Sequence, residues 1–384
     1  MVKASFTDKG GSAEGALAQY FRAAGFIAIR GLPFRHDGDD ITDVDVWLYE
    51  RGSGLERRRF IVDAKYKARP KIAERLLWTA GLRDALEVDG GFVAATGVRD
   101  TTRRLARRID ITIIDFQALG GGSIEKLKSK DRRSKEEISK LLGDIDKQRE
   151  SKLWRSQVSD ALAALLISFG GGSANVALRE AHFYADQATL AAPGSIAAGM
   201  AVRLFYLCAA VAGISLDYVA AQGAFQPPDK RRAYIEEIIR FGADHQEKKA
   251  RIDLALELTR QYLPNGSTLA NQLRDRLLAS AAEIPAAVIE EVVSKMVGKG
   301  ILFEAAKSLE NAAHMINLPG FMDLQVEAKT LVGAVLDFVG VDRERLADAW
   351  SPAVDDERAQ PEGSQTASLS IKKSRISRTE LELT

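Results

Sequence analysis

Cysteine and histidine are scarce in this sequence, which has one cysteine and four histidines among 384 residues. The single cysteine, Cys208, excludes an internal disulfide framework and a zinc knuckle. It lies in an apolar run, where a buried packing role is favoured over a nucleophilic one. His182, His245 and His314 are far apart and lack the spacing of metal ligands, so core or surface roles are predicted for them.

The sequence also lacks a strong net charge and a long hydrophobic run. With 54 Lys and Arg against 53 Asp and Glu, no global field attracts a polyanion, so any such signal must be local. The most apolar stretch, residues 204–216, is bracketed by Arg203 and Asp217 and is too short to span a bilayer. Residues 1–11 contain no signal-peptide core. We therefore expect a cytoplasmic protein without a membrane partner.

Two stretches, residues 41–49 and 60–67, alternate polar with apolar side chains and are rich in Val, Ile, Tyr and Trp. This pattern predicts two antiparallel strands joined by a hairpin loop over residues 50–59. Alternation puts Val44, Val46 and Leu48 on one face of the first strand, and Asp43, Asp45 and Trp47 on the other. In the second strand one row is Phe60, Val62, Ala64 and Tyr66, and the other is Ile61, Asp63, Lys65 and Lys67.

Asp45, Asp63 and Lys65 are therefore predicted to converge on one side of a small sheet. Neighbouring carboxylates repel each other, and a hard dication such as Mg²⁺ relieves this by taking oxygen ligands from both. A lysine on the same face is placed to orient a metal-bound water or to stabilise a pentavalent phosphate. The alternative is a solvated Asp-x-Lys ion pair. The second acid, Asp45, favours metal-dependent phosphodiester cleavage.

This arrangement resembles the PD-(D/E)xK nuclease superfamily, in particular Mrr-like restriction endonucleases and archaeal-type Holliday junction resolvases. The motifs that carry the resemblance are Asp45 in Thr-Asp-Val-Asp-Val and Asp63-Ala64-Lys65. Glu14 in Ser-Ala-Glu-Gly-Ala-Leu matches the helix acid of that group. The resemblance implies that Glu14, Asp45 and Asp63 hold Mg²⁺, with Mn²⁺ as an alternative, and that Lys65 is catalytic. For Glu14, stabilisation by the dipole of the helix is the competing interpretation.

The order of predicted elements extends the resemblance over about the first third of the chain. A helix over residues 12–24, capped by Ser12, precedes a strand over 26–30 and a polar loop over 33–40. In that loop, His36 is either a second metal ligand or a solvated side chain; in the following strand, Asp43 is a supporting candidate ranked below Asp45. After the hairpin come a helix over 71–88, a strand over 92–96, a helix over 101–108 and a strand over 111–116. The helix over 71–88 lacks the glutamine that relatives often have, so Glu74 or Arg75 would have to serve.

Basic residues cluster close to these motifs and can contact phosphates without reading bases. They are Arg57, Arg58 and Arg59 in the predicted loop, Lys67, Arg69 and Lys71 after the second strand, and Arg103, Arg104, Arg107 and Arg108 on a helix. A solvated surface face is the alternative for each run. We see no recognition helix, zinc finger or aromatic platform, so base specificity is not predicted.

The fold class that we predict is α+β followed by all-α: a restriction-endonuclease-like core with a central mixed sheet flanked by helices, then a helical domain. Gly120-Gly121-Gly122 marks the first boundary. The predicted units are a nuclease-like domain over 1–120, a charged linker helix over 121–153, an all-helical domain over 154–350 and a disordered tail over 351–384. Breaks in the helical part are expected at Gly170–Gly172, Pro193, Pro227–Pro228, Pro264–Gly266, Pro285 and Pro319.

The sequence supports two candidate functions that belong to different classes. The first is a Mg²⁺-dependent endonuclease acting on DNA, in restriction or defence against foreign DNA as the resemblance suggests, with RNA as a further alternative substrate. The second is a catalytically inactive protein that keeps the nuclease fold as a DNA-binding or assembly module. In either case the helical domain is expected to mediate homo-oligomerisation or to bind a partner protein.

Overall fold

A computed structural model describes residues 6–53, 55–64, 71–115, 131–242, 245–298 and 300–350. The N-terminal part contains, in order, α1 (Phe6–Ala23), β1 (Ile27–His36), β2 (Asp39–Arg51), β3 (Arg57–Ala64), α2 (Ile72–Ala85), β4 (Gly90–Ala95), α3 (Asp100–Arg108) and β5 (Ile111–Asp115). This succession is the predicted one. The predicted disordered tail, residues 351–384, lies outside the described residues.

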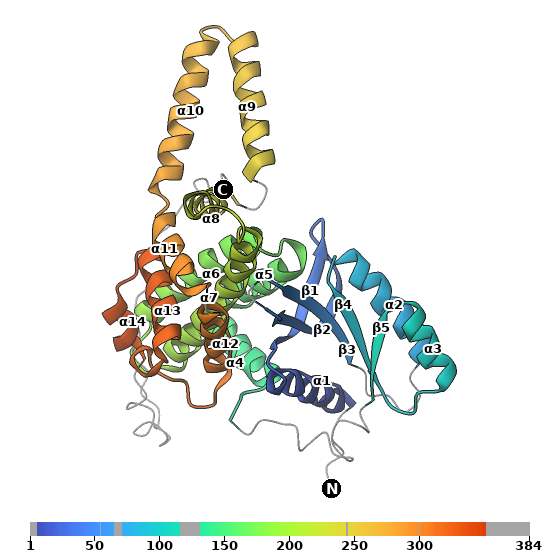
Figure 1. Ribbon diagram of the computed structural model, residues 1–384. Helices are drawn as coiled ribbons and strands as arrows, with labels where there is room; N and C mark the ends of the chain where they lie inside the picture. Colours follow the sequence, from blue (N-terminus) through green and yellow to red (C-terminus); the bar gives the residue numbers. More distant parts are fainter. Residues whose placement is uncertain are drawn as a thin grey trace.

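The strands form one five-stranded sheet in the order β1-β2-β3-β4-β5 (Figure 1). The first three strands are antiparallel, as the alternating sequence predicted. β3, β4 and β5 are parallel, and α2 and α3 form the crossovers between them. The N-terminal part is therefore a mixed sheet flanked by helices, as predicted at this level.

Each face of the sheet is covered by a different set of helices. On one face, α1 packs its Leu17 and Phe21 against Val46, Leu48 and Val62. On the other face, α2 and α3 cover β4 and β5. The helical part of the chain covers β1 and β2 on that same second face, where Trp47 and Tyr49 are fully buried (Figure 1). Burying each large side chain stabilises the fold by roughly 1.5–3 kcal/mol, so the sheet depends on both layers.

Three bounds of the N-terminal helix and strands differ from the prediction. β1 continues to His36 instead of ending at Arg30, and only Asp37 and Gly38, both with positive φ, form the turn. β3 begins at Arg57, so Arg57, Arg58 and Arg59 belong to a strand and not to the loop. α1 begins at Phe6, so Ser12 lies inside the helix and is not its cap.

The alternation along β2 also shifts at Asp45. Val46 packs toward α1 as predicted, but Val44 belongs to the core on the opposite face. The neighbouring strand has Gly31, with a left-handed φ of 61°, between the residues paired with Val44 and Val46. A glycine in this conformation lets the strand turn its side chains to the other face, a device common beside functional sites.

The remainder of the described chain is helical. Its helices are α4 (Lys135–Gln148), α5 (Leu153–Ile167), α6 (Gly171–Leu190), α7 (Ile196–Gln222), α8 (Pro228–Phe241), α9 (His245–Tyr262), α10 (Gly266–Glu283), α11 (Ala286–Met296), α12 (Ile301–His314), α13 (Val326–Val339) and α14 (Arg343–Ala349), with a short 3₁₀ turn η2 (Phe321–Asp323). Every predicted glycine or proline break coincides with a boundary between two described elements, and several of these residues lie in the first turn of the following helix. α9 and α10 form a long hairpin that projects from the body (Figure 1).

Two expectations about individual helices are corrected. α4 was expected to be an exposed linker, but Leu142 and Ile145 are buried in the common core. α7 has 27 residues and is long and apolar enough to cross a membrane by length and composition, although 89% of its most apolar window is buried in this fold. It is the central helix of the helical part, and Cys208 is fully buried in it as predicted.

Candidate functional site

Asp45 and Asp63 lie next to each other on two paired strands, where the pairing of β2 with β3 ends. β2 and β3 are in register at Val46 and Val62, so the next residues along the pair are Asp45 and Asp63. The main-chain N–H of Ala64 donates a hydrogen bond of 2.8 Å to Asp45 Oδ2. The alternating sequence therefore brings the two predicted carboxylates together, with Asp45 fixed against the backbone of β3.

Asp63 is ion-paired with Arg75 of α2. Both side chains are only 16% exposed, and Asp63 Oδ2 is buried without a hydrogen-bond partner within the described part of the chain. Burial lowers the pKa of Arg75, while the charge of Asp45 acts to raise it. Arg75 therefore lies within electrostatic reach of both carboxylates.

Glu14 reaches the same region from α1, on the other side of β2. It accepts a hydrogen bond of 3.0 Å from Arg30 Nη2 of β1. Burial raises the pKa of Glu14, the Arg30 hydrogen bond acts to lower it, and the charge of Asp45 raises it further. Arg30 also pairs at 2.9 Å with Glu136 Oε1 of α4. Glu14 thus lies within electrostatic reach of Asp45, while Arg30 pairs with Glu14 and Arg75 pairs with Asp63.

Together, these side chains do not form a site that is already arranged to bind a metal ion. Among the residues described, no three His, Cys, Asp or Glu side chains are arranged to hold a metal ion. Lys65, the predicted catalytic lysine, lies outside the described residues, as do Lys67 and Arg69. His36 is the last residue of β1 and has a side chain that is 74% exposed.

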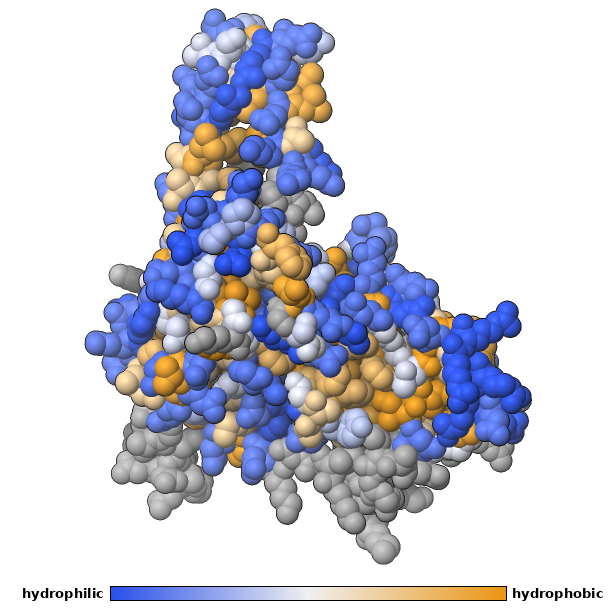
Figure 2. Space-filling view, viewed as in Figure 1, coloured by the Kyte–Doolittle hydropathy of each residue, from blue (hydrophilic) through white to orange (hydrophobic). Residues whose placement is uncertain are grey.

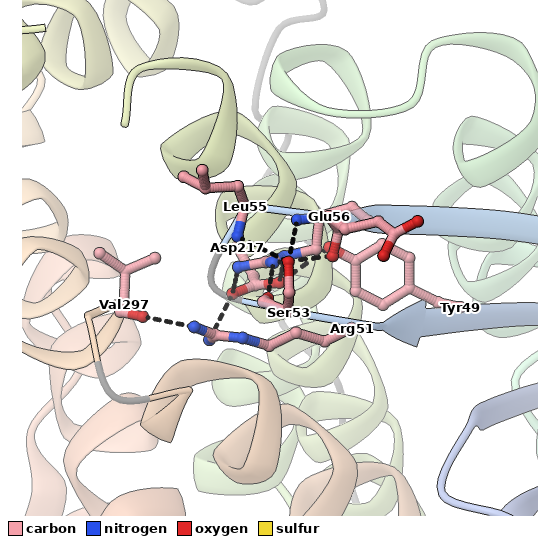
Figure 3. Close-up of polar contacts among 8 residues, drawn as sticks. Tyr49, Arg51, Ser53, Leu55, Glu56, Asp217 and Val297 are labelled. Atoms are coloured by element: carbon pink, nitrogen blue, oxygen red, sulfur yellow. Dashed lines mark hydrogen bonds and ion pairs between the residues drawn. The ribbon is translucent and has the colours of Figure 1, made fainter. Parts of the chain in front are cut away.

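Arg57 is buried and not placed to contact nucleic acid, which corrects that prediction, and Arg59 is half-buried. The Arg57 side chain is only 2% exposed and binds both carboxylate oxygens of Asp217 in α7. Tyr49 donates to the same carboxylate at 2.8 Å, and Arg51 pairs with it at 3.3 Å (Figure 3). Arg59 lies over the ring of Phe169, 5.0 Å from its centroid. Both arginines therefore join the sheet to the helical part.

The other predicted basic residues are accessible. Arg58, Arg104 and Arg107 are exposed, as is Lys71, which pairs with Glu74 at 2.8 Å. Arg103 is 41% exposed and pairs with Asp115 at 3.3 Å. The strongly hydrophilic surface over α3 is visible in Figure 2.

Sequence reasoning missed Arg30 and Glu136 as members of this site. Their pairing connects residues 106 positions apart, and neither residue belongs to a recognisable motif. Arg75 was named only as a substitute for the missing glutamine, and it is this residue, and not Glu74, that reaches the acids.

Comparisons of the chain with protein-family models, with curated proteins and with solved structures find no match.

Proposed function

We propose that this chain is a Mg²⁺-dependent endonuclease that hydrolyses DNA phosphodiester bonds. The observation that supports this most directly is the adjacency of Asp45 and Asp63 on paired strands, with Glu14 within electrostatic reach of Asp45. Hydrolysis of foreign DNA, in restriction or defence, is the use that we propose for it.

The donor atoms suit a hard dication. Asp63 Oδ2 is buried without a hydrogen-bond partner in the described structure, an arrangement that costs free energy unless something binds the oxygen. Asp63 and Asp45 would hold Mg²⁺ or Mn²⁺, with Glu14 as the third acid, because carboxylate oxygens are the ligands that these ions prefer. The bound ion would supply Lewis acidity and a bound water of lowered pKa.

The chain's own residues have distinct roles in this proposal. Asp45 is held in place by the Ala64 N–H and orients the site. Arg75 neutralises Asp63 before metal is bound, and its guanidinium would then stabilise negative charge on the phosphate. Lys65, two residues after Asp63 in the sequence, would orient the attacking water. Arg58, Arg104 and Arg107 would hold the DNA backbone.

The experiment is a nicking assay on supercoiled plasmid with Mg²⁺, Mn²⁺ or EDTA. We expect cleavage with either metal, and a loss of at least about 100-fold for Asp63→Asn, Asp45→Asn and Lys65→Ala, a range typical for removal of a catalytic group. Asp229→Asn, an exposed acid on α8, is the matched control. Equal cleavage by wild type and all three variants would refute the site.

The second candidate is a catalytically inactive module that keeps this fold. The pairing of Asp63 with Arg75, and of Glu14 with Arg30, favours it because each pair neutralises a predicted ligand. Such a protein would show salt-sensitive DNA binding without heat of Mg²⁺ binding in calorimetry. Replacing Arg104 and Arg107 together would lower the salt slope of that binding by about 2.

A further inference from the structure

A cavity of about 650 Å³ lies between the sheet part and the helical part. Its wall is built from α1, β1, the start of α4, α5, α7 and the end of α12. This volume is within the range of about 300–1,000 Å³ that is usual for small-molecule sites. The cavity is distinct from the Asp45–Asp63 site, since neither of these residues lines it.

The cavity wall is strongly basic. Its charged side chains include the cations Arg22, Arg30, Arg132, Arg133, Lys135, Arg155 and Arg203, against the acids Asp43, Glu136 and Glu137. The wall also has apolar side chains, among them Ile29, Leu142, Leu162 and Leu204. A ligand that fits both features carries several negative charges and an apolar ring.

Part of this positive charge is already compensated beneath the wall. Glu310 of α12 is almost fully buried and pairs with Arg132 at 2.8 Å and with Arg22 at 3.3 Å. Burial acts to raise the pKa of Glu310, but the charges of Arg22 and Arg132 lower it to about 2, so this acid remains ionised. Glu310 therefore fixes two guanidinium groups at the bottom of the cavity.

Other donor atoms at the wall form no hydrogen bond with an acid in the described part of the chain. The Nε atoms of Arg22 and Arg133 are buried without a hydrogen-bond partner in the described part of the chain. Lys135 Nζ donates only to a carbonyl, Gly31 O, at 2.9 Å. The N-terminus of α4 lies at the same wall, and its dipole adds a partial positive charge. Guanidinium and ammonium groups gathered in this way favour a phosphate.

We propose that this cavity binds a phosphorylated nucleotide, with its phosphates on Arg133 and Lys135 and its base against the apolar wall. The cavity is also connected to the predicted metal ligand Glu14, because Arg30 lines the cavity and its Nη2 donates a hydrogen bond of 3.0 Å to Glu14. A phosphate there competes with Glu14 and Glu136 for Arg30. Nucleotide binding thus changes the charge around Glu14, and this second step rests on the proposed nuclease function.

The binding test is calorimetry on the full chain in EDTA, with AMP, ATP, adenosine and inorganic phosphate as probes. We expect AMP and ATP to bind more tightly than phosphate and adenosine. Arg133→Gln and Lys135→Gln should each weaken ATP binding by about tenfold or more, as expected for loss of a charged hydrogen bond. Arg251→Gln, exposed on α9, should have no effect. Thermal unfolding of each variant shows whether it is folded.

Absence of ATP binding by the wild type, or unchanged binding by both folded variants, would overturn the proposal. Phosphate that binds as tightly as AMP would overturn its nucleotide part. The coupling is tested separately: AMP should change the rate of plasmid nicking by the wild type and not by Arg133→Gln. A chain that binds AMP but nicks no DNA would refute the proposed function and leave the cavity assignment standing.

Discussion

Arg75 of α2 forms an ion pair with Asp63 of β3, at the position where the proposed mechanism needs a metal ligand. The pair is partly buried, so the guanidinium and a cation would compete for one carboxylate with little screening by water. In the proposed site, the affinity for Mg²⁺ would therefore depend on Arg75.

The first prediction concerns this competition. Arg75→Gln should tighten Mg²⁺ binding without DNA by about tenfold, because one nearby positive charge is removed. The same variant should cleave DNA more slowly at saturating Mg²⁺, since the guanidinium no longer stabilises the phosphate. Calorimetry and the nicking assay measure the two effects. Arg104→Gln is the control for metal binding, and a weaker Mg²⁺ affinity in Arg75→Gln would contradict the prediction.

The second prediction concerns Asp217, which has no exposed surface and binds Arg51, Arg57 and Tyr49. Asp217→Asn leaves two guanidinium groups without their carboxylate and should lower the free energy of unfolding by roughly 3–5 kcal/mol. Urea denaturation measures this loss. Asp229→Asn, on the exposed first turn of α8, should change stability by no more than about 0.5 kcal/mol. Similar stability losses in the two variants would contradict the role of the buried cluster.

The third prediction is a loss of stability in acid. Burial lowers the pKa of His314 from 6.5 to about 4, so between these values the unfolded chain binds a proton that the folded chain does not. The pKa of Glu310, lowered from 4.5 to about 2, extends the same trend to lower pH. Stability should therefore fall from pH 6.5 downwards, by an amount on the order of 3 kcal/mol for each group.

Chemical denaturation at several pH values tests this. His314→Gln should remove the dependence between pH 6.5 and 4.5 and keep the dependence below it. The control is His182→Gln, at a half-exposed position on α6. An unchanged slope in His314→Gln would show that another group is responsible.

The fourth prediction concerns self-association through the α9–α10 hairpin. Apolar side chains lie at intervals of four residues along each helix, with Leu254 61% exposed and Tyr262 70% exposed. Figure 2 shows apolar side chains among hydrophilic ones along this hairpin. Two such hairpins can bury these stripes in a four-helix bundle. We expect the wild type to be a dimer and the double variant Leu254→Glu, Leu258→Glu to be a monomer, as measured by light scattering. The control variant Asp253→Asn should remain a dimer. A wild type that is monomeric at all concentrations would refute the bundle.

Much of the N-terminal part could be predicted from sequence because its signals are local. The alternation of polar and apolar side chains predicted β2 and β3, and it also predicted that Asp45 lies beside Asp63. Glycine and proline located the ends of the helices. These patterns depend on neighbours within a few residues, which sequence displays directly.

The errors concern long-range contacts. Arg57 looked like a loop arginine, but its partner Asp217 is 160 residues away, and no periodicity predicts that pairing. Val44 changed faces because Gly31, on another strand, adopts a positive φ. Arg30 became part of the site through α4, which was expected to be an exposed linker.

The buried carboxylate of Asp217 links α7 of the helical part to β2 and β3 of the sheet (Figure 3). If residues 1–115 were expressed alone, the rings of Trp47 and Tyr49 would face water and two arginines would lose their counterion. Conversely, α7 is tied through Asp217 to Arg57 of β3, the strand that also carries Asp63. The sequence of α7, the longest helix that the structure describes, is thus constrained by an ion pair that holds a strand of another layer.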